Sequence, residues 1–276
     1  MVKSYLLLCR SLVGVLSLAP GRWDAERLVG VPTRRVGTSI LILGMVLAAC
    51  GQPAIVPLRV QAVPWANGER STYQITDINN SPAGTATIEF TIGATQIPEE
   101  AWTMRREVAA QGSQEVVTVE MTASGLRPAI SLLTRQSGDN RREQVKSTYN
   151  QGQVDLELTT AQDITTYERI NVPSDVRDQR TLLALVRALP LANGYATQIN
   201  SFLPVADLLE RTTIQVTDEE EVQTPAGAYT TWRIALITPD SESQAWVSTS
   251  APYILVKFVD GRTGGTYELS DYQIGQ

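Results

Sequence analysis

Apolar and polar residues alternate along most of the chain after residue 70, which is the pattern of β-strands. In the clearest runs, 85–92, 117–121 and 154–159, every second residue is apolar. Such alternation puts one row of side chains in a core and the other in water, as in antiparallel strands with one solvated face. Turn-forming clusters such as 79–82 and 150–152 separate the runs. The predicted strands are 70–78, 83–92, 102–111, 115–122, 127–135, 141–150, 153–159, 163–170, 195–203, 212–217, 228–238, 243–248, 253–259 and 265–271.

One segment, 178–189, has the period of a helix instead. Asp178 or an earlier polar residue can cap its start, and Pro190 and Gly194 end it. A shorter helix over 205–211 is also predicted. The apolar residues of the main helix recur at i, i+3, i+4 and i+7 and form one face: Leu182, Leu185, Val186 and Leu189.

These elements predict a mainly β fold. Because strands twist, a sheet of so many strands has to curl or close. We therefore expect a single long antiparallel meander that forms a strongly curved sheet or half-barrel, with the helix at about 178–189 against its concave face. Residues 69–276 show no break in composition, so they are predicted to form one β-rich domain.

Before this domain, the chain contains a short apolar run, 40–46, that follows Arg34 and Arg35 and leads into Leu47-Ala48-Ala49-Cys50. The run is too short to span a bilayer, which takes about 20 apolar residues. A basic start, a short apolar stretch and small residues before the cleavage point are typical of an export signal. The ending resembles a bacterial lipobox, in which the cysteine accepts a lipid such as palmitate. The alternative is a buried helix of a globular domain.

We therefore predict a lipoprotein signal peptide over 1–49 and lipidation of Cys50. Since this leader is long, we hypothesise that translation starts nearer Val31 or Val36. Three prolines within 50–68 favour extended backbone, so this stretch is predicted to be a tether. An edge strand within 55–63 is the alternative. The domain is then expected on the extracytoplasmic side, held to the cell membrane or the outer membrane.

Composition excludes several kinds of chemistry. The chain has no histidine and two cysteines, Cys9 in the leader and Cys50 at the lipobox. Histidine-based triads, histidine metal sites, disulfides and cysteine nucleophiles are therefore not expected in the domain. Six of the 23 basic and two of the 29 acidic residues precede Cys50, so the remainder has a formal charge of −10. An acidic surface disfavours nucleic acid as a partner. No metal or other cofactor is expected.

Four motifs together resemble the family known as domain of unknown function 3108. They are Gly84 within 81–86, the leucine-rich helix with its Leu-Pro-Leu ending and Gly194, the turn within 222–229 followed by Trp232, and the closing strands within 245–257. The resemblance extends over roughly 70–272. It implies an exported β-rich protein of unassigned activity, and it supplies no catalytic residues.

A concave sheet with one covering helix leaves apolar surface that a ligand can occupy. We therefore predict that the helix stripe and the apolar residues of two strands bind a hydrophobic ligand. Core packing is the alternative for the same residues. The predicted ligand-binding residues are Trp102, Met104, Leu182, Leu185, Val186, Leu189, Trp232 and Ile234.

The leading hypothesis is thus a lipid-anchored, non-enzymatic envelope protein that binds a hydrophobic or lipid-like molecule. The alternative is a structural or protein-binding module with a filled core, and the volume between helix and sheet distinguishes the two. The acidic clusters 99–100 and 218–221 are interpreted as solvated loop charge, although paired carboxylates could also serve a hydrolase. The sequence identifies no protein partner.

Overall fold

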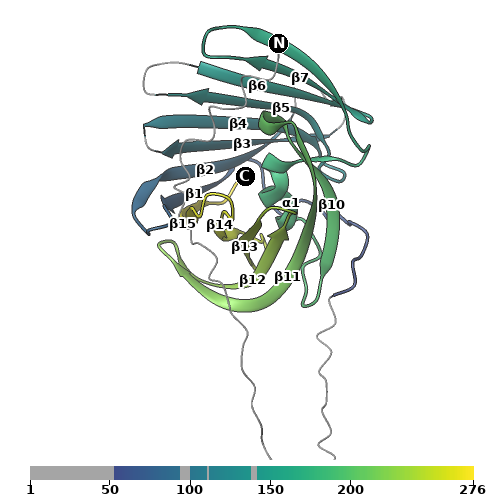
Figure 1. Ribbon diagram of the computed structural model, residues 1–276. Coiled ribbons are helices and arrows are strands. Elements are labelled where there is room, and N and C mark those ends of the chain that lie inside the picture. The colour runs from purple at the N-terminus through teal and green to yellow at the C-terminus, as the bar shows by residue number, and fades with distance from the viewer. Residues whose placement is uncertain (1–52, 94–99, 111, 138–141) are drawn as a thin grey trace, which may run out of the picture. The chain divides into compact units, whose positions relative to one another are not determined.

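The computed structural model describes residues 53–93, 100–110, 112–137 and 142–276. Their first half forms a meander of eight antiparallel strands, each hydrogen-bonded to the next (Figure 1). Side chains alternate between the buried and the solvated face, as in β4. The strands are β1 (Glu69–Thr76), β2 (Pro82–Ile92), β3 (Ala101–Ala110), β4 (Ser113–Thr122), β5 (Pro128–Gln136), β6 (Arg142–Asn150), β7 (Gln153–Thr159) and β8 (Thr165–Asn171).

The second half adds seven strands to the same sheet. β9 and β10 are parallel, and the other neighbours are antiparallel. The last strand, β15, pairs with β1, so the final strand of the domain lies beside its first in the middle of a 15-stranded sheet. The strands are β9 (Arg177–Asp178), β10 (Ala196–Leu203), β11 (Leu208–Thr224), β12 (Gly227–Ile237), β13 (Glu242–Ser248), β14 (Leu255–Val259) and β15 (Thr266–Gln273).

The helical segment lies inside the curve of the sheet (Figure 1). It begins with the short 3-10 turn η1 (Gln179–Thr181), where the Asp178 carboxylate accepts a hydrogen bond from the backbone N–H of Arg180 at 2.8 Å. The α-helix α1 (Leu182–Arg187) follows, and its leucines join the main hydrophobic core. No helix among the described ranges is long and apolar enough to cross a membrane.

The predicted fold class is confirmed: the described residues are mainly β, with one curved sheet and one α-helix inside it. Four details differ. The sheet is not a single antiparallel meander, because β9 and β10 are parallel and the chain returns so that β15 pairs with β1. The helix predicted over 205–211 is wrong, because a second 3-10 turn, η2 (Pro204–Ala206), leads directly into β11. The predicted strand 212–217 is much longer, so the acidic cluster 218–221 lies within β11 rather than in a loop. β9 was not predicted, since two residues carry no periodicity.

The two edge strands of the sheet, β8 and β9, are close in sequence but do not pair. Side chains join the two ends of the sheet instead. Phe202 of β10 is fully buried in a small second core with Val154 and Leu156 of β7. Beside it, the Tyr149 hydroxyl donates to an Asp178 carboxylate oxygen at 2.7 Å. This junction keeps the sheet curled without closing it into a barrel.

The segment before β1 packs against the domain over much of its length. Val56 forms an isolated β-bridge with Thr197 of β10. Trp65 is buried, and its ring stacks on Phe90 with centroids 4.1 Å apart. The tether predicted over 50–68 is therefore bound to the domain from Val56 onward. The alternative prediction was an edge strand within 55–63. In this stretch the structure has only the single bridge between Val56 and Thr197.

A buried ion pair fastens α1 to the sheet. Arg187 Nη1 lies 2.8 Å from Glu69 Oε1, and both side chains are almost fully buried. The Tyr272 hydroxyl donates to the other Glu69 oxygen at 3.0 Å. The Arg187 guanidinium also donates to the carbonyl of Tyr253 at 2.8 Å. The pair thus connects the end of α1 with β1, β15 and the loop before β14.

Candidate functional site

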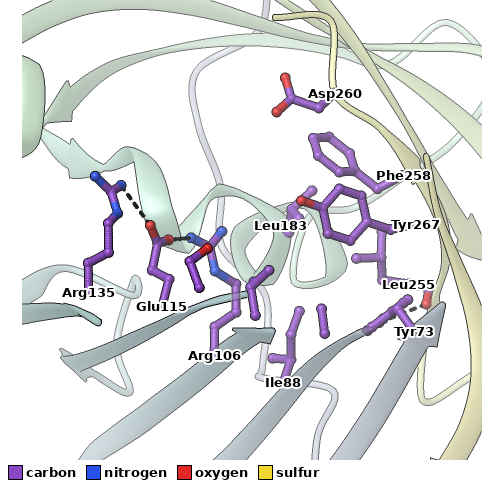
Figure 2. Close-up of a pocket in the computed structure, with 13 residues that line it drawn as sticks. Tyr73, Ile88, Arg106, Glu115, Arg135, Leu183, Leu255, Phe258, Asp260 and Tyr267 are labelled. Atoms are coloured by element: carbon purple, nitrogen blue, oxygen red, sulfur yellow. Dashed lines mark hydrogen bonds and ion pairs between the residues drawn. The ribbon is translucent and has the colours of Figure 1, made fainter. Parts of the chain in front are cut away.

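Two adjoining cavities lie inside the curve of the sheet. The larger has a volume of about 400 Å³ and the smaller about 240 Å³. The larger volume is within the range of ligand-binding pockets, roughly 300–1,000 Å³. Leu183 of α1 borders both cavities, and Figure 2 shows it on the helix, behind the ring of Tyr267. The residues common to both linings are Arg106, Leu183, Phe258 and Asp260.

The two walls of the larger cavity differ in polarity. On one side lie the apolar side chains of Ile88, Leu255 and Phe258, with the ring of Tyr267 (Figure 2). Burial raises the pKa of Tyr267, so its hydroxyl stays neutral at physiological pH. The other side is charged. A cavity of this kind suits a molecule with one apolar and one polar end.

The charged wall is made by strand positions that face the interior. On β3, Met104 and Arg106 are two residues apart and share the inner face, and on β5 Leu133 and Arg135 do the same. Glu115 of β4 stands directly opposite Arg135 in the register of the sheet. The inner face is thus apolar at one end of these strands and charged at the other.

Two arginines share one carboxylate in this wall. Arg106 Nη2 lies 3.0 Å from Glu115 Oε1, and Arg135 Nη2 lies 2.9 Å from Glu115 Oε2 (Figure 2). Burial opposes ionisation of Glu115, but the charge of Arg106 and the hydrogen bond and charge of Arg135 outweigh it and lower its pKa. The carboxyl is therefore ionised at neutral pH, and the cluster has a formal charge of +1.

A third arginine, Arg180 of η1, lines the smaller cavity together with Arg106. The positive charge of Arg180 also lowers the pKa of Glu115, so the Arg180 guanidinium lies near the carboxylate that Arg106 and Arg135 share. Arg262 also lines the smaller cavity, and its Nη2 lies 2.6 Å from Glu210 Oε2. Asp260 is the other acidic side chain of the linings, and its Oδ1 accepts from the backbone N–H of Arg262 at 2.9 Å.

The predicted ligand-binding residues lie mostly beside the cavities rather than around them. Of the eight, Leu182 lines the smaller cavity. Trp232 is half-buried and packs against the main core. The other six are buried in that core: Trp102, Met104, Leu185, Val186, Leu189 and Ile234.

The predicted faces are nevertheless the ones that lead to the cavities. Arg106 lies two residues after Met104 on the same face of β3. Leu236 lies two residues after Ile234 on β12. Both Arg106 and Leu236 line the smaller cavity. Sequence reasoning missed Arg106, Glu115 and Arg135 because charged residues near turns were interpreted as solvated. The signal that could have found them is their position in the apolar row of an alternating strand.

The other predicted sites fall elsewhere. Cys50 and the rest of the lipobox lie outside the described residues, as does Glu99. In the cluster within β11, Glu220 accepts a hydrogen bond from the indole N–H of Trp246. Within the described ranges, no three acidic, cysteine or histidine side chains are grouped as metal ligands.

A family model for proteins of unknown function, DUF3108, matches residues 72–269. The chain belongs to the DUF3108 family. The resemblance noted in the sequence is therefore confirmed, over nearly the same span. No curated protein matches.

The solved structures similar to this DUF3108 chain are remote in sequence. A β-barrel-like protein of domain of unknown function DUF1849 from Brucella abortus is 13% identical, with a TM-score of 0.49, over 78% of this chain and 99% of the other. A candidate lipoprotein from Parabacteroides distasonis is 12% identical, with a TM-score of 0.29 and the same coverage. A candidate exported protein with a YmcC-like fold from Bacteroides fragilis is 10% identical, with a TM-score of 0.27, over 78% and 100%.

One motif that carried the resemblance has a steric explanation. Gly84 of β2 lies opposite Ala110 of β3 with φ +156°. A Cβ at this position would lie 2.1 Å from the Ala109 carbonyl oxygen, which no side chain tolerates. The glycine therefore allows the close approach of two neighbouring strands, and its role is in the fold rather than in a site.

Proposed function

We propose that this protein binds a hydrophobic or amphipathic molecule in the cavities inside its curved sheet and acts as a binding protein rather than an enzyme. The observation that supports this most is the cavity of about 400 Å³ between α1 and the sheet. A structural module with a filled core would have no such space. The apolar wall formed by Ile88, Leu255 and Phe258 suits an acyl chain or a similar apolar group.

Leu183 occupies the key position for testing this proposal, because it borders both cavities. Leu183→Trp places a bulky ring at their junction. With the neutral apolar fluorophore N-phenyl-1-naphthylamine as the probe, we expect saturable binding to the unaltered protein. Leu183→Trp should weaken that binding by roughly tenfold or more, since the ring takes the space of the probe.

The control is Leu209→Trp, which makes the same change on β11 at a leucine that is 43% exposed and lines neither cavity. Its probe affinity should equal that of the unaltered protein. Circular dichroism melting of both variants shows whether each is folded. Absence of saturable binding to the unaltered protein would refute the proposal, and so would equal binding by a folded Leu183→Trp variant.

We further propose that the protein is a lipoprotein, exported and anchored through a lipid on Cys50. The apolar run 40–46 and the lipobox-like ending Leu47-Ala48-Ala49-Cys50 support it. The domain would then lie on the extracytoplasmic side of the membrane to which the lipid is bound. This destination suits a protein whose ligand is itself lipid-like.

Metabolic labelling tests the anchor. In a bacterial host supplied with a tagged palmitate, the unaltered chain should take up the label and sediment with membranes. Cys50→Ser should lose all of the label, because the acceptor thiol is gone. Cys9→Ser removes the other cysteine of the chain and should keep the label. Equal labelling of Cys50→Ser and the unaltered chain would rule out this anchor.

A further inference from the structure

Arg180 is a buried cation with part of its hydrogen-bonding capacity unused. The side chain is 6% exposed, and Nη1 donates to the Ser131 hydroxyl at 2.9 Å. Nη2 is buried and has no hydrogen-bond partner. Across the described ranges, no carboxylate oxygen lies within 4 Å of this guanidinium. A buried N–H without an acceptor is costly, so a group that accepts a hydrogen bond from it is favoured.

Arg180 lines the smaller cavity, and its position is held firmly. The backbone N–H of Arg180 is held by Asp178, and Nη1 by Ser131. Arg106 lines the same cavity and also has a buried N–H, at Nε, without a partner. Two arginines from different parts of the chain thus line one space, and each has a buried N–H without a partner. Arginine donors suit the oxygens of a carboxylate or a phosphate.

The charge of the site contrasts with the charge of the protein. The chain has a formal net charge of −6. The linings of the two cavities contain two acidic residues, Glu115 and Asp260, and four basic ones: Arg106, Arg135, Arg180 and Arg262. Arg262 is neutralised by Glu210, which lies behind it. Behind Arg180 lies the buried carboxylate of Asp178, which accepts from the backbone N–H of Arg180. The side chains that line the cavities are thus mostly basic, inside an acidic protein.

The apolar wall adjoins this positive end. Leu183 and Phe258 border both cavities, and Ile88 and Leu255 continue the apolar surface into the larger one (Figure 2). A volume of about 400 Å³ is that of roughly a dozen water molecules or methylene groups. This is the size of one acyl chain rather than two.

We propose that the cavity binds a single-chain amphiphile with an anionic head, with Arg180 and Arg106 holding the head and the wall around Leu183 holding the chain. The inference rests on the proposed function and names the class of ligand. A fatty acid and a single-chain phosphate ester share this chemistry.

Displacement of N-phenyl-1-naphthylamine by ligands with the same twelve-carbon chain tests the inference on the intact protein. The competitors are dodecanoate, dodecyl phosphate, neutral dodecanol and cationic dodecyltrimethylammonium. At least one anion should compete roughly 10- to 100-fold better than dodecanol, because each charge-assisted hydrogen bond adds affinity. The cation should compete worst. The stronger of the two anions identifies the source, a fatty acid or a phosphate ester.

Two substitutions that should change the anion affinity in opposite directions test whether the arginines bind the head group. Arg180→Met should abolish the preference for the anion and leave dodecanol unchanged. Glu115→Gln removes the carboxylate that engages Arg106 and Arg135, and it should increase anion affinity. Arg169→Met is the control: this arginine of β8 pairs with Asp155 and lines neither cavity, so its binding should not change. If Arg180→Met does not fold, Glu115→Gln alone decides.

The two proposals fail differently. If dodecanol and both anions compete equally, the inference is overturned and the proposed function stands. If the unaltered protein does not bind the fluorophore or any competitor, both fall. Unchanged anion affinity in a folded Arg180→Met variant, or lower anion affinity in Glu115→Gln, would also overturn the assignment of the head to this end of the cavity.

Discussion

Arg187→Met is expected to destabilise the protein by about 3–5 kcal/mol, because it leaves the Glu69 carboxylate buried without its counterion. Glu69 is 1% exposed, and Arg187 Nη1 lies 2.8 Å from it. The substitution also removes hydrogen bonds to the carbonyls of Pro252 and Tyr253. The guanidinium lies over the rings of Trp65 and Phe90 as well, 5.4 Å from each centroid.

Urea unfolding followed by tryptophan fluorescence measures the loss. The control is Arg105→Met, which breaks an exposed pair with Glu107 and should cost about 0–1 kcal/mol. Replacing both partners, as Glu69→Leu with Arg187→Met, should recover part of the lost stability, since no unpaired charge remains. A loss for Arg187→Met no larger than that of Arg105→Met would mean that the buried pair does not hold α1 in place.

Phe202→Ala is expected to cost about 3–5 kcal/mol, the usual effect of removing a fully buried phenyl ring. The ring is 0% exposed and joins β10 to Val154 and Leu156 of β7. Because β8 and β9 do not pair, this small core is a main contact between the two ends of the sheet. Its loss should loosen that junction in particular.

Hydrogen exchange locates the effect, and urea unfolding gives its size. Protection should fall most in β7 and β10, while β1 and β15 in the centre of the sheet keep theirs at low denaturant. Tyr167→Ala on the edge strand β8 is the control, because this ring is 75% exposed; its stability should change by no more than about 0.5 kcal/mol. A uniform loss of protection would show that Phe202 stabilises the whole sheet rather than its junction.

Local pattern predicted most of the elements correctly. The alternating strands from β1 to β8 and the helical segment were found from their periods alone. The prediction failed at 205–211, where a few apolar residues mimic a helix but Pro204 begins a 3-10 turn followed by β11. It also missed β9, whose two residues become a strand only because β10 lies beside them.

The candidate site was less accessible to sequence reasoning. Periodicity identified the faces that carry Met104 and Ile234, but both residues lie in packed core. Whether an inner-face residue meets a neighbour or a cavity depends on how strongly the sheet curls. On the helix, Leu183 lies outside the predicted apolar stripe, yet it is the residue of α1 that borders both cavities. Arg180 gave no sequence signal, since its isolation follows from its surroundings.

By itself, the sequence determined the strands, the helix, the absence of histidine, the lipobox-like motif and the family, because these depend on residue types and short spacings. The tertiary structure alone decided that β15 pairs with β1 and that the ends of the sheet meet at Phe202. It also decided that three arginines converge around Glu115. The physical reason is that these contacts join residues far apart in sequence, and the curvature that brings them together comes from the twist accumulated over the whole sheet.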